Sequence, residues 1–434
     1  MVLNLKKKHT VYIETYGCSA SYSDSEICAG QLTQAGYSIV DNPRESDVNI
    51  IVTCTVKTAT ANRMTHRIKK LSETNSPLVV AGCMPKTQTN EIKKLNPNAS
   101  MMGPDSIDKI TDIVNSTLQG NRVIELSTSN KPKVLLPKVR INPVIDIVEI
   151  GTGCLSSCTF CQVKIAKGTL VSYPPDAIIK QITDSTNTSC NEIWLTSTDN
   201  GCYGMDMMMD LADLLEMIIK IPNSFFVRVG MMNPMHTKNK FNKLFDAFAD
   251  EKIYKFLHIP VQSGNNRVLK SMLRGHSIED FKAMSSNFRK KFPLSSLATD
   301  IIVGYPTESD EEFQDTIDLL KCTKPDVVNL SKYGARPGTK AIEMEQVPND
   351  IINQRSKLLS MIIKDISLNQ NQKWLNWTGQ CLVNEKGKIE GTMIGRNFAY
   401  KPIVLKTSDV ILGNIYNVKV TDVHTTYLSA KIFE

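Results

Sequence analysis

Three cysteines stand within eight residues near the middle of the chain, and their spacing is its strongest chemical signal. Cys154, Cys158 and Cys161 follow the pattern C-x3-C-x2-C in the stretch GCLSSCTFC. A zinc ion would need one more cysteine or histidine to complete its tetrahedron, and the next candidates, Cys190 and His236, lie well beyond the triad. A 4Fe–4S cluster held by three thiolates leaves one iron open for a small chelating molecule. The spacing therefore indicates an iron–sulfur cluster with a non-protein fourth ligand.

A second set of cysteines, Cys18, Cys54 and Cys83, is scattered over the first hundred residues. Each directly follows a short apolar run, and helical patterns such as 58–73 lie between the runs, which indicates a doubly wound parallel sheet. Ligands gather beyond the carboxyl ends of such strands, so the three thiols can share one metal site. The alternative is three small buried residues. The runs are VYIETYG (11–17), VNIIVT (48–53) and LVVAG (78–82).

The elements that must position the triad begin after a proline-containing, basic segment at 130–143, which we interpret as a linker. Six strand-like runs then alternate with helical patterns, which predicts a partial, TIM-like (β/α)6 barrel, short of the eight repeats of a closed one. The triad follows the first run and therefore lies on the carboxyl face, where barrel active sites lie. The runs span 144–150, 192–197, 225–230, 256–261, 297–304 and 327–332.

The chain ends in a different pattern. After a helical segment at 350–373, short and evenly spaced strands predict a small all-β, OB-like module. Aromatic and basic residues alternate in it, as in grooves that hold nucleic acid, although the same rings could be core and the charges solvated. We therefore predict an α/β protein with three domains, at 8–125, 140–372 and 373–434. The alternating residues are Phe398, Tyr400, Tyr416 and Tyr427 with Arg396, Lys401 and Lys419.

Composition sets outer limits on function. The 434 residues are 41% hydrophobic and 22% charged, with a net charge of +7, which is typical of a soluble globular protein and compatible with nucleic acid. No segment approaches the ~18 apolar residues of a membrane span. Eleven cysteines in a large chain of this kind indicate metal binding or catalysis rather than disulfides. We expect a cytoplasmic protein.

The triad motif resembles that of the radical S-adenosylmethionine superfamily. The resemblance implies that the amino and carboxylate groups of S-adenosylmethionine occupy the open iron. It places Phe160 in the slot whose backbone contacts the adenine, and it makes the polar residues after the second and fourth runs candidates for the ribose and methionine groups. Ser-Thr-Asp stands here where the family often has Gly-Gly-Glu, and ordinary turn chemistry is the alternative for these residues. The candidates are Thr198, Asp199, Gln262 and Ser263.

Over residues 10 to 434 the chain resembles the methylthiotransferase family, which joins an auxiliary-cluster domain, a radical barrel and a C-terminal TRAM domain. ETYGC, TCTVKTATANRM and AGCM look like its three auxiliary motifs, which makes Cys18, Cys54 and Cys83 ligands of a second 4Fe–4S cluster. RVGMMNP and SKYGARPGT look closest to the archaeal and eukaryotic branch, which modifies N6-threonylcarbamoyladenosine beside the tRNA anticodon. KIAKG carries Lys167 where that branch often has arginine.

The resemblance implies a tRNA methylthiotransferase that uses two S-adenosylmethionine molecules. One methylates a sulfur on the auxiliary cluster, and the second yields the radical that removes hydrogen from carbon 2 of adenine. The cofactors carry this chemistry, so no side chain is predicted to be catalytic. We expect a monomer that receives electrons from a donor such as ferredoxin or flavodoxin.

Four basic residues are the candidates for binding the tRNA anticodon stem-loop. Arg228 is a candidate for the threonylcarbamoyl carboxylate, with a salt bridge at the barrel mouth as the alternative; Arg336, Arg396 and Lys401 are candidates for the tRNA backbone. The rival functions are the same chemistry on isopentenyladenosine tRNA or on a ribosomal-protein aspartate, and a zinc-bound RNA-binding protein without catalysis.

Overall fold

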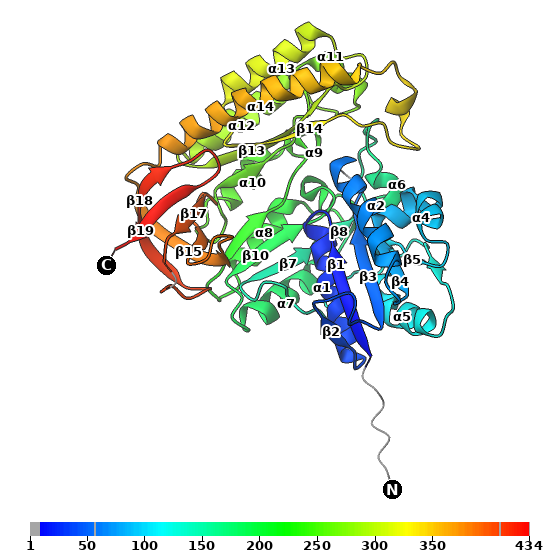
Figure 1. Cartoon of the computed structure of the whole chain (residues 1–434). Coiled ribbons are helices and arrows are strands. Elements are labelled where there is room, and N and C mark those ends of the chain that lie inside the picture. The colour runs from blue at the N-terminus through cyan, green and yellow to red at the C-terminus, as the bar shows by residue number, and fades with distance from the viewer. Residues whose placement is uncertain (1–8, 56–57, 408, 434) are drawn as a thin grey trace.

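The amino-terminal part is a parallel sheet with helices on both faces (Figure 1). The computed structural model describes residues 9–55, 58–407 and 409–433; the first residue of the predicted first domain and two residues of its second cysteine motif, Val56 and Lys57, lie outside this part. The strand order is β2-β1-β3-β4-β5-β6, and every pairing is parallel. The strands are β1 (Thr10–Thr15), β2 (Ser38–Val40), β3 (Val48–Thr53), β4 (Leu78–Gly82), β5 (Ser100–Met102) and β6 (Ile124–Glu125).

Helices cover this sheet because its central strands are apolar on both faces. All residues of β3 and β4 are buried, as expected for a parallel sheet covered on two sides. The runs predicted at 48–53 and 78–82 match these strands, whereas the short strands β2, β5 and β6 were not predicted. The helices are α1 (Ser19–Gln34), α2 (Thr58–Ser72), α3 (Cys83–Thr87), α4 (Thr89–Leu95), η1 (Pro104–Lys109) and α5 (Ile110–Leu118).

The central part contains the six predicted parallel strands as two three-stranded sheets, β11-β10-β7 and β12-β13-β14. A parallel bridge between Val227 and Ile253 continues the arrangement from one sheet toward the other. The prediction of a (β/α)6 partial barrel is thus confirmed, and a short antiparallel pair, β8 (Gly151–Thr152) with β9 (Val171–Ser172), was missed. The strands are β7 (Ile145–Glu149), β10 (Glu192–Thr196), β11 (Phe226–Val229), β12 (Phe256–His258), β13 (Ser296–Val303) and β14 (Val327–Lys332).

The main core of the protein lies between these strands and the outer helices. Helices α8, α12 and α13 begin with capping boxes, in which the capping side chain and the third helical residue bond each other's backbone amides. No helix of the described residues is long and apolar enough to cross a membrane. The helices are α6 (Val163–Lys167), α7 (Pro175–Thr186), η2 (Asn200–Cys202), α8 (Leu211–Ile219), α9 (Pro234–Thr237), α10 (Phe241–Ala247), α11 (Asn266–Ser271), α12 (Ile278–Lys291), α13 (Asp310–Thr323), η3 (Lys340–Glu343) and α14 (Asn349–Gln372).

A closed five-stranded barrel, β15-β16-β17-β19-β18, forms the carboxyl-terminal part, as the OB-like prediction requires. It lies at the amino ends of the central strands, whereas the amino-terminal sheet lies toward their carboxyl ends (Figure 1). Asn384 of the small barrel donates to Glu192, the first residue of β10, at 2.6 Å. The small barrel therefore closes the floor of the central barrel. Its strands are β15 (Thr378–Lys386), β16 (Met393–Arg396), β17 (Pro402–Leu405), β18 (Ile415–Val423) and β19 (Leu428–Ile432).

Candidate cofactor and substrate site

The cysteine set of the amino-terminal part, Cys18, Cys54 and Cys83, lies at the carboxyl edge of the amino-terminal sheet. Cys54 follows β3, Cys83 begins α3 directly after β4, and Cys18 precedes α1. A hydrogen bond from Cys54 lowers the pKa of the Cys18 thiol, while burial, with a contribution from the Cys18 charge, raises the pKa of Cys83 to about 12. The three thiols therefore share one neighbourhood, as the strand-end argument predicts.

The triad loop is held on the carboxyl face by its own backbone and by one arginine. Gly153 has φ +72°, and a Cβ there would lie 1.9 Å from the carbonyl oxygen of Thr169, so the approach of these two segments requires glycine. Arg274 donates from Nη1 to Cys158 Sγ at 3.3 Å. Burial raises the pKa of Cys161 to about 12, and its sulfur accepts a hydrogen bond from the Val163 amide at 3.4 Å.

The two cysteine sets face each other. Helix α3, which begins at Cys83, packs against α6, which begins two residues after Cys161. The guanidinium of Arg336 lies in the electrostatic range of both Cys54 and Cys161, which raise its pKa, although burial lowers the pKa overall. Only 7% of Arg336 is exposed, so its position favours a place between the two thiol sets over the predicted contact with the tRNA backbone.

Four buried charges connect the two domains that carry these sets; we call them the interdomain charge cluster. Lys133 of the linker binds Asp24 of α1 and Glu149 of β7, with N–O distances of 2.6 Å each, and Lys167 binds Glu149 at 3.3 Å. Burial disfavours the charge of Lys167, but Glu149 outweighs it and raises the pKa of this lysine. Lys167 is thus part of the domain contact.

Asp199 and its neighbour Thr198, two of the residues predicted to hold S-adenosylmethionine, lie beside the triad. Thr198 Oγ1 and Asp199 Oδ2 are buried and have no hydrogen-bond partner in the part of the chain that the structure describes. Asp199 lies near Cys154, whose pKa is raised by burial and by this carboxylate. His236 Nε2 lies 3.7 Å from Asp199 Oδ2, and both oxygens could still accept a hydrogen bond from an α-ammonium group bound beside the triad. The three thiols fit a cluster, and the oxygens fit its chelating ligand.

The remaining candidates for this ligand are Gln262 and Ser263, on the loop after β12, and Phe160, on the triad loop itself. Gln262 has φ +77°, a strained conformation for a residue other than glycine, of the kind that collects at functional sites. Ser263 follows it and is fully buried. The ring of Phe160 packs edge-on against Tyr305, with ring centroids 6.5 Å apart, which fixes the backbone before Cys161.

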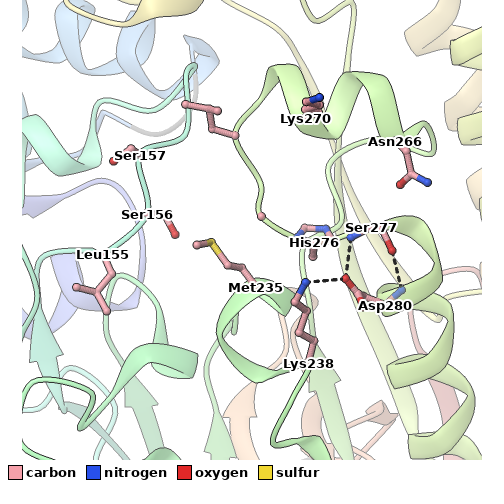
Figure 2. Close-up of a pocket in the computed structure, with 12 residues that line it drawn as sticks. Leu155, Ser156, Ser157, Met235, Lys238, Asn266, Lys270, His276, Ser277 and Asp280 are labelled. Carbon is pink, nitrogen blue, oxygen red and sulfur yellow. Dashed lines mark hydrogen bonds and ion pairs between the residues drawn. The ribbon is translucent and has the colours of Figure 1, made fainter.

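A pocket of about 790 Å³ lies behind the triad loop (Figure 2). Ser156 and Ser157 of the loop form one wall, and Lys270 and the ion pair of Lys238 with Asp280, at 3.0 Å, lie across from them. None of the six predicted cysteines lines this pocket. Because Ser156 and Ser157 separate two triad cysteines, the pocket is the outer approach to the triad.

The inner face of the barrel carries a caged arginine. The guanidinium carbon of Arg228 lies 5.2, 5.6 and 5.4 Å from the ring centroids of Trp194, Phe256 and Tyr400. The guanidinium carbon of Arg396 also lies over the ring of Tyr400, 4.7 Å from its centroid. The predicted salt bridge for Arg228 is not found among the described residues, since its guanidinium contacts rings instead of a carboxylate.

Lys401, predicted to contact the tRNA backbone, has another role in the structure. Its ammonium is 5% exposed and binds Asp326 and Asn371, at 2.7 Å each. It joins the small barrel to the central one, and its charge is already neutralised, so the burial argues against a phosphate contact. Sequence analysis also missed Arg274 and the interdomain charge cluster, because neither has a characteristic spacing.

Any zinc site would need thiols that converge on one point at about 2.3 Å from the ion. Among the described residues, no three cysteine, histidine, aspartate or glutamate side chains are arranged to hold a single ion.

Comparisons with known proteins cover nearly the whole chain. The uncharacterized protein family UPF0004 matches residues 10–103, the radical SAM superfamily residues 148–320, and the TRAM domain residues 380–433. A probable threonylcarbamoyladenosine tRNA methylthiotransferase of Pyrococcus abyssi is 38% identical, covering 97% of this chain and 99% of the relative. The threonylcarbamoyladenosine tRNA methylthiotransferase of Homo sapiens is 34% identical, covering 94% and 72%.

Solved structures support the same architecture. The radical S-adenosylmethionine methyltransferase TsrM from Kitasatospora setae has a TM-score of 0.56 and 11% identity, covering 77% of this chain and 75% of that one. The cobalamin-dependent radical enzyme OxsB has a TM-score of 0.52 and 13% identity, covering 82% and 56%. At these identities the likeness concerns the fold alone.

Proposed function

The chain belongs to the threonylcarbamoyladenosine tRNA methylthiotransferase family of radical S-adenosylmethionine enzymes, and from this premise we propose that it places a methylthio group on carbon 2 of N6-threonylcarbamoyladenosine in tRNA. It is a radical transferase by family, and the family implies S-adenosylmethionine and a 4Fe–4S cluster. We propose a second 4Fe–4S cluster on Cys18, Cys54 and Cys83.

The observation that carries the proposal is the juxtaposition of two three-thiol sets from different domains. Helix α3 packs on α6, and Arg336 lies within electrostatic range of both Cys54 and Cys161, so the two sets lie near each other. When bound, the cofactors supply a radical that abstracts hydrogen and the sulfur that replaces it. The protein's part is to hold the adenine between the two sets and to keep water and competing groups away.

The residues around the triad have orienting roles in this proposal. Thr198 Oγ1 and Asp199 Oδ2 would accept from the ammonium of S-adenosylmethionine, and Gln262 and Ser263 would bond its ribose and methionine groups. Arg274 donates to Cys158 and so places positive charge beside the triad. The Phe160 backbone would contact the adenine of the same molecule.

We place the tRNA across the small barrel and the open side of the central barrel. TRAM-type modules with rings and cations suit a nucleic-acid backbone, and Arg396 remains the candidate phosphate contact, since 19% of its side chain is exposed and its nearest carboxylate, Glu385, is 3.9 Å away. The chain would act as a monomer in the cytoplasm.

The reaction also needs a one-electron donor, for which we propose a ferredoxin or flavodoxin. Such acidic proteins would approach through the pocket behind the triad loop, where Lys270 is exposed. Reversing this charge with Lys270→Glu is expected to slow cluster reduction by flavodoxin, with reduction by dithionite unchanged. Equal rates for the variant and the wild type with flavodoxin would remove this approach route.

The test is anaerobic reconstitution followed by nucleoside mass spectrometry. About eight irons and matching sulfide per chain are expected for two 4Fe–4S clusters. Incubation with S-adenosylmethionine, a reductant and tRNA bearing threonylcarbamoyladenosine should yield its 2-methylthio derivative. Product on isopentenyladenosine tRNA or on a ribosomal-protein aspartate alone would favour those rivals, and colourless, zinc-loaded protein would end the radical proposal.

A further inference from the structure

We propose that Arg228 is the receptor for the carboxylate of the threonylcarbamoyl group, and so the residue that selects this substrate. The inference rests on the proposed function and adds a recognition element to it. The modified base differs from plain adenosine by a ureido-linked threonine, whose carboxylate is its only full charge. A site that selects this group therefore needs a fixed cation within reach of the bound base.

The aromatic cage fixes the Arg228 side chain. Three rings contribute to it, Trp194 from the neighbouring strand, Phe256 from β12 and Tyr400 from the small barrel, with centroids 5.2 to 5.6 Å from the guanidinium carbon. Trp194 is also the register partner of Arg228 across β10 and β11. Ring faces stabilise a guanidinium without using its N–H donors. The cage therefore orients the group and leaves its hydrogen-bonding capacity for a ligand.

The donors of this guanidinium have no partner within the described residues. Nε of Arg228 is buried and makes no hydrogen bond, and no carboxylate of the described residues forms an ion pair with this arginine. The buried Nε donor has lost water without gaining an acceptor, which is costly to leave so. An unmet donor fork of this kind matches a carboxylate, which arginine binds bidentately.

The carboxylates near the cage are engaged by other groups. Two guanidinium groups, Arg228 and Arg396, lie over the ring of Tyr400. The buried carboxylate nearby, Glu192, already accepts from Trp194, from Tyr254 and from Asn384. The other nearby carboxylate, Glu385, lies 3.9 Å from Arg396, so both carboxylates have partners other than Arg228.

The inner face above the cage is polar and reachable. His258 and Asp300 form a pair at 3.0 Å, with 13% and 28% of their side chains exposed, and Asn329 donates to Asp300 at 2.7 Å. These groups can meet the hydroxyl and ureido N–H of a threonylcarbamoyl chain. An isopentenyl group offers no charge or acceptor, so it would leave the donors of Arg228 without a ligand partner.

The experiment measures binding of the full chain, reconstituted with iron and sulfide, to three anticodon stem-loop RNAs. They carry adenosine, N6-threonylcarbamoyladenosine, or its threonyl methyl ester, which keeps the shape and removes the charge. The wild type is expected to prefer the acid over the ester by roughly ten- to hundredfold, as for a hydrogen-bonded ion pair. Arg228→Met should bind acid and ester equally, and its affinity for the adenosine stem-loop should match that of the wild type.

The matched control is Arg140→Met, which removes a half-buried arginine bonded to Thr188, away from the cage, and should keep the wild-type preference. A wild type that does not distinguish acid from ester overturns the inference without any variant, as does an Arg228→Met protein that still distinguishes them. A uniform loss on all three RNAs would instead assign Arg228 to a phosphate. If the wild type distinguishes acid from ester but forms no methylthio product, the proposed reaction fails while the carboxylate receptor stands.

Discussion

Replacing Lys133 by methionine removes the ammonium that two buried carboxylates share. Lys133 is 5% exposed, and Asp24 and Glu149 are 3% and 2% exposed, at 2.6 Å each. Glu149 retains Lys167 at 3.3 Å, whereas Asp24 has no other ion-pair partner in the described residues. The substitution leaves the buried Asp24 carboxylate without its counter-charge. It should therefore lower the free energy of unfolding by about 3–5 kcal/mol.

The loss should depend on pH in a direction set by Asp24. Burial already raises the pKa of this carboxyl to about 6 with Lys133 present, despite the lysine's opposing effect, and removing the lysine raises it further. A raised carboxyl pKa means that the folded state binds a proton that the unfolded state has released. The proton bound in the folded state contributes fully to stability below the pKa of Asp24 in the unfolded chain, near 4. This contribution is lost as the pH rises through the pKa of Asp24 in the folded protein. Lys133→Met should therefore be most destabilised near pH 8 and much less so near pH 5.5.

Urea denaturation of the reduced, metal-free chain at both pH values is the assay. The double variant Lys133→Met/Asp24→Asn, which also neutralises the orphaned carboxylate, should recover much of the lost stability at pH 8, and Lys131→Met, on an exposed lysine two residues away, is the control. A loss below ~1 kcal/mol, or one equal at both pH values, would refute the reasoning that places a dry, charged contact at this domain boundary.

Three further variants test other parts of the site. Cys54→Ala should lower the iron content from about eight to about four per chain while the triad cluster keeps its electron paramagnetic resonance signal, and unchanged iron would exclude Cys54 as a ligand. Arg274→Met should make the triad cluster harder to reduce by ~50–100 mV in a redox titration, because a cationic donor to Cys158 stabilises the reduced state; an unshifted potential would contradict this. Lys401→Met should destabilise the chain by ~2 kcal/mol, since Arg289 still binds Asp326, and should leave the salt dependence of tRNA binding unaltered; a smaller salt slope would restore its phosphate contact.

The strand-end positions of the cysteines were predictable because parallel strands share one carboxyl edge. That rule needs only local apolar runs, which the sequence shows clearly at β3 and β4. The short strands β2, β5 and β6 have two or three residues each, too few to show a period. They are strands because a longer neighbour supplies their hydrogen bonds, which is a property of the assembled sheet.

The roles of the basic residues were much less predictable, because a charge acquires its role from partners far along the chain. Lys401 and Arg396 are five residues apart in one aromatic and basic pattern, yet Lys401 is neutralised by Asp326, 75 residues away. Arg336 stands in a glycine- and proline-containing loop that gives no sign of its place between two thiol sets. Composition can indicate that cations are present, but only the packing decides which of them remain free for a ligand.

Buried charge at the domain boundary suits the geometry that the proposed reaction needs. An apolar contact can slide with little change in free energy, whereas Lys133 satisfies Asp24 and Glu149 together only in one relative position of the two domains. Those domains carry the two thiol sets, and a displacement of about 1 Å between reacting groups can cost a hundredfold in rate. If the charge cluster sets this register, Lys133→Met/Asp24→Asn should fold and hold about eight irons yet form the methylthio product slowly. Wild-type turnover in that variant would show that apolar packing alone positions the clusters.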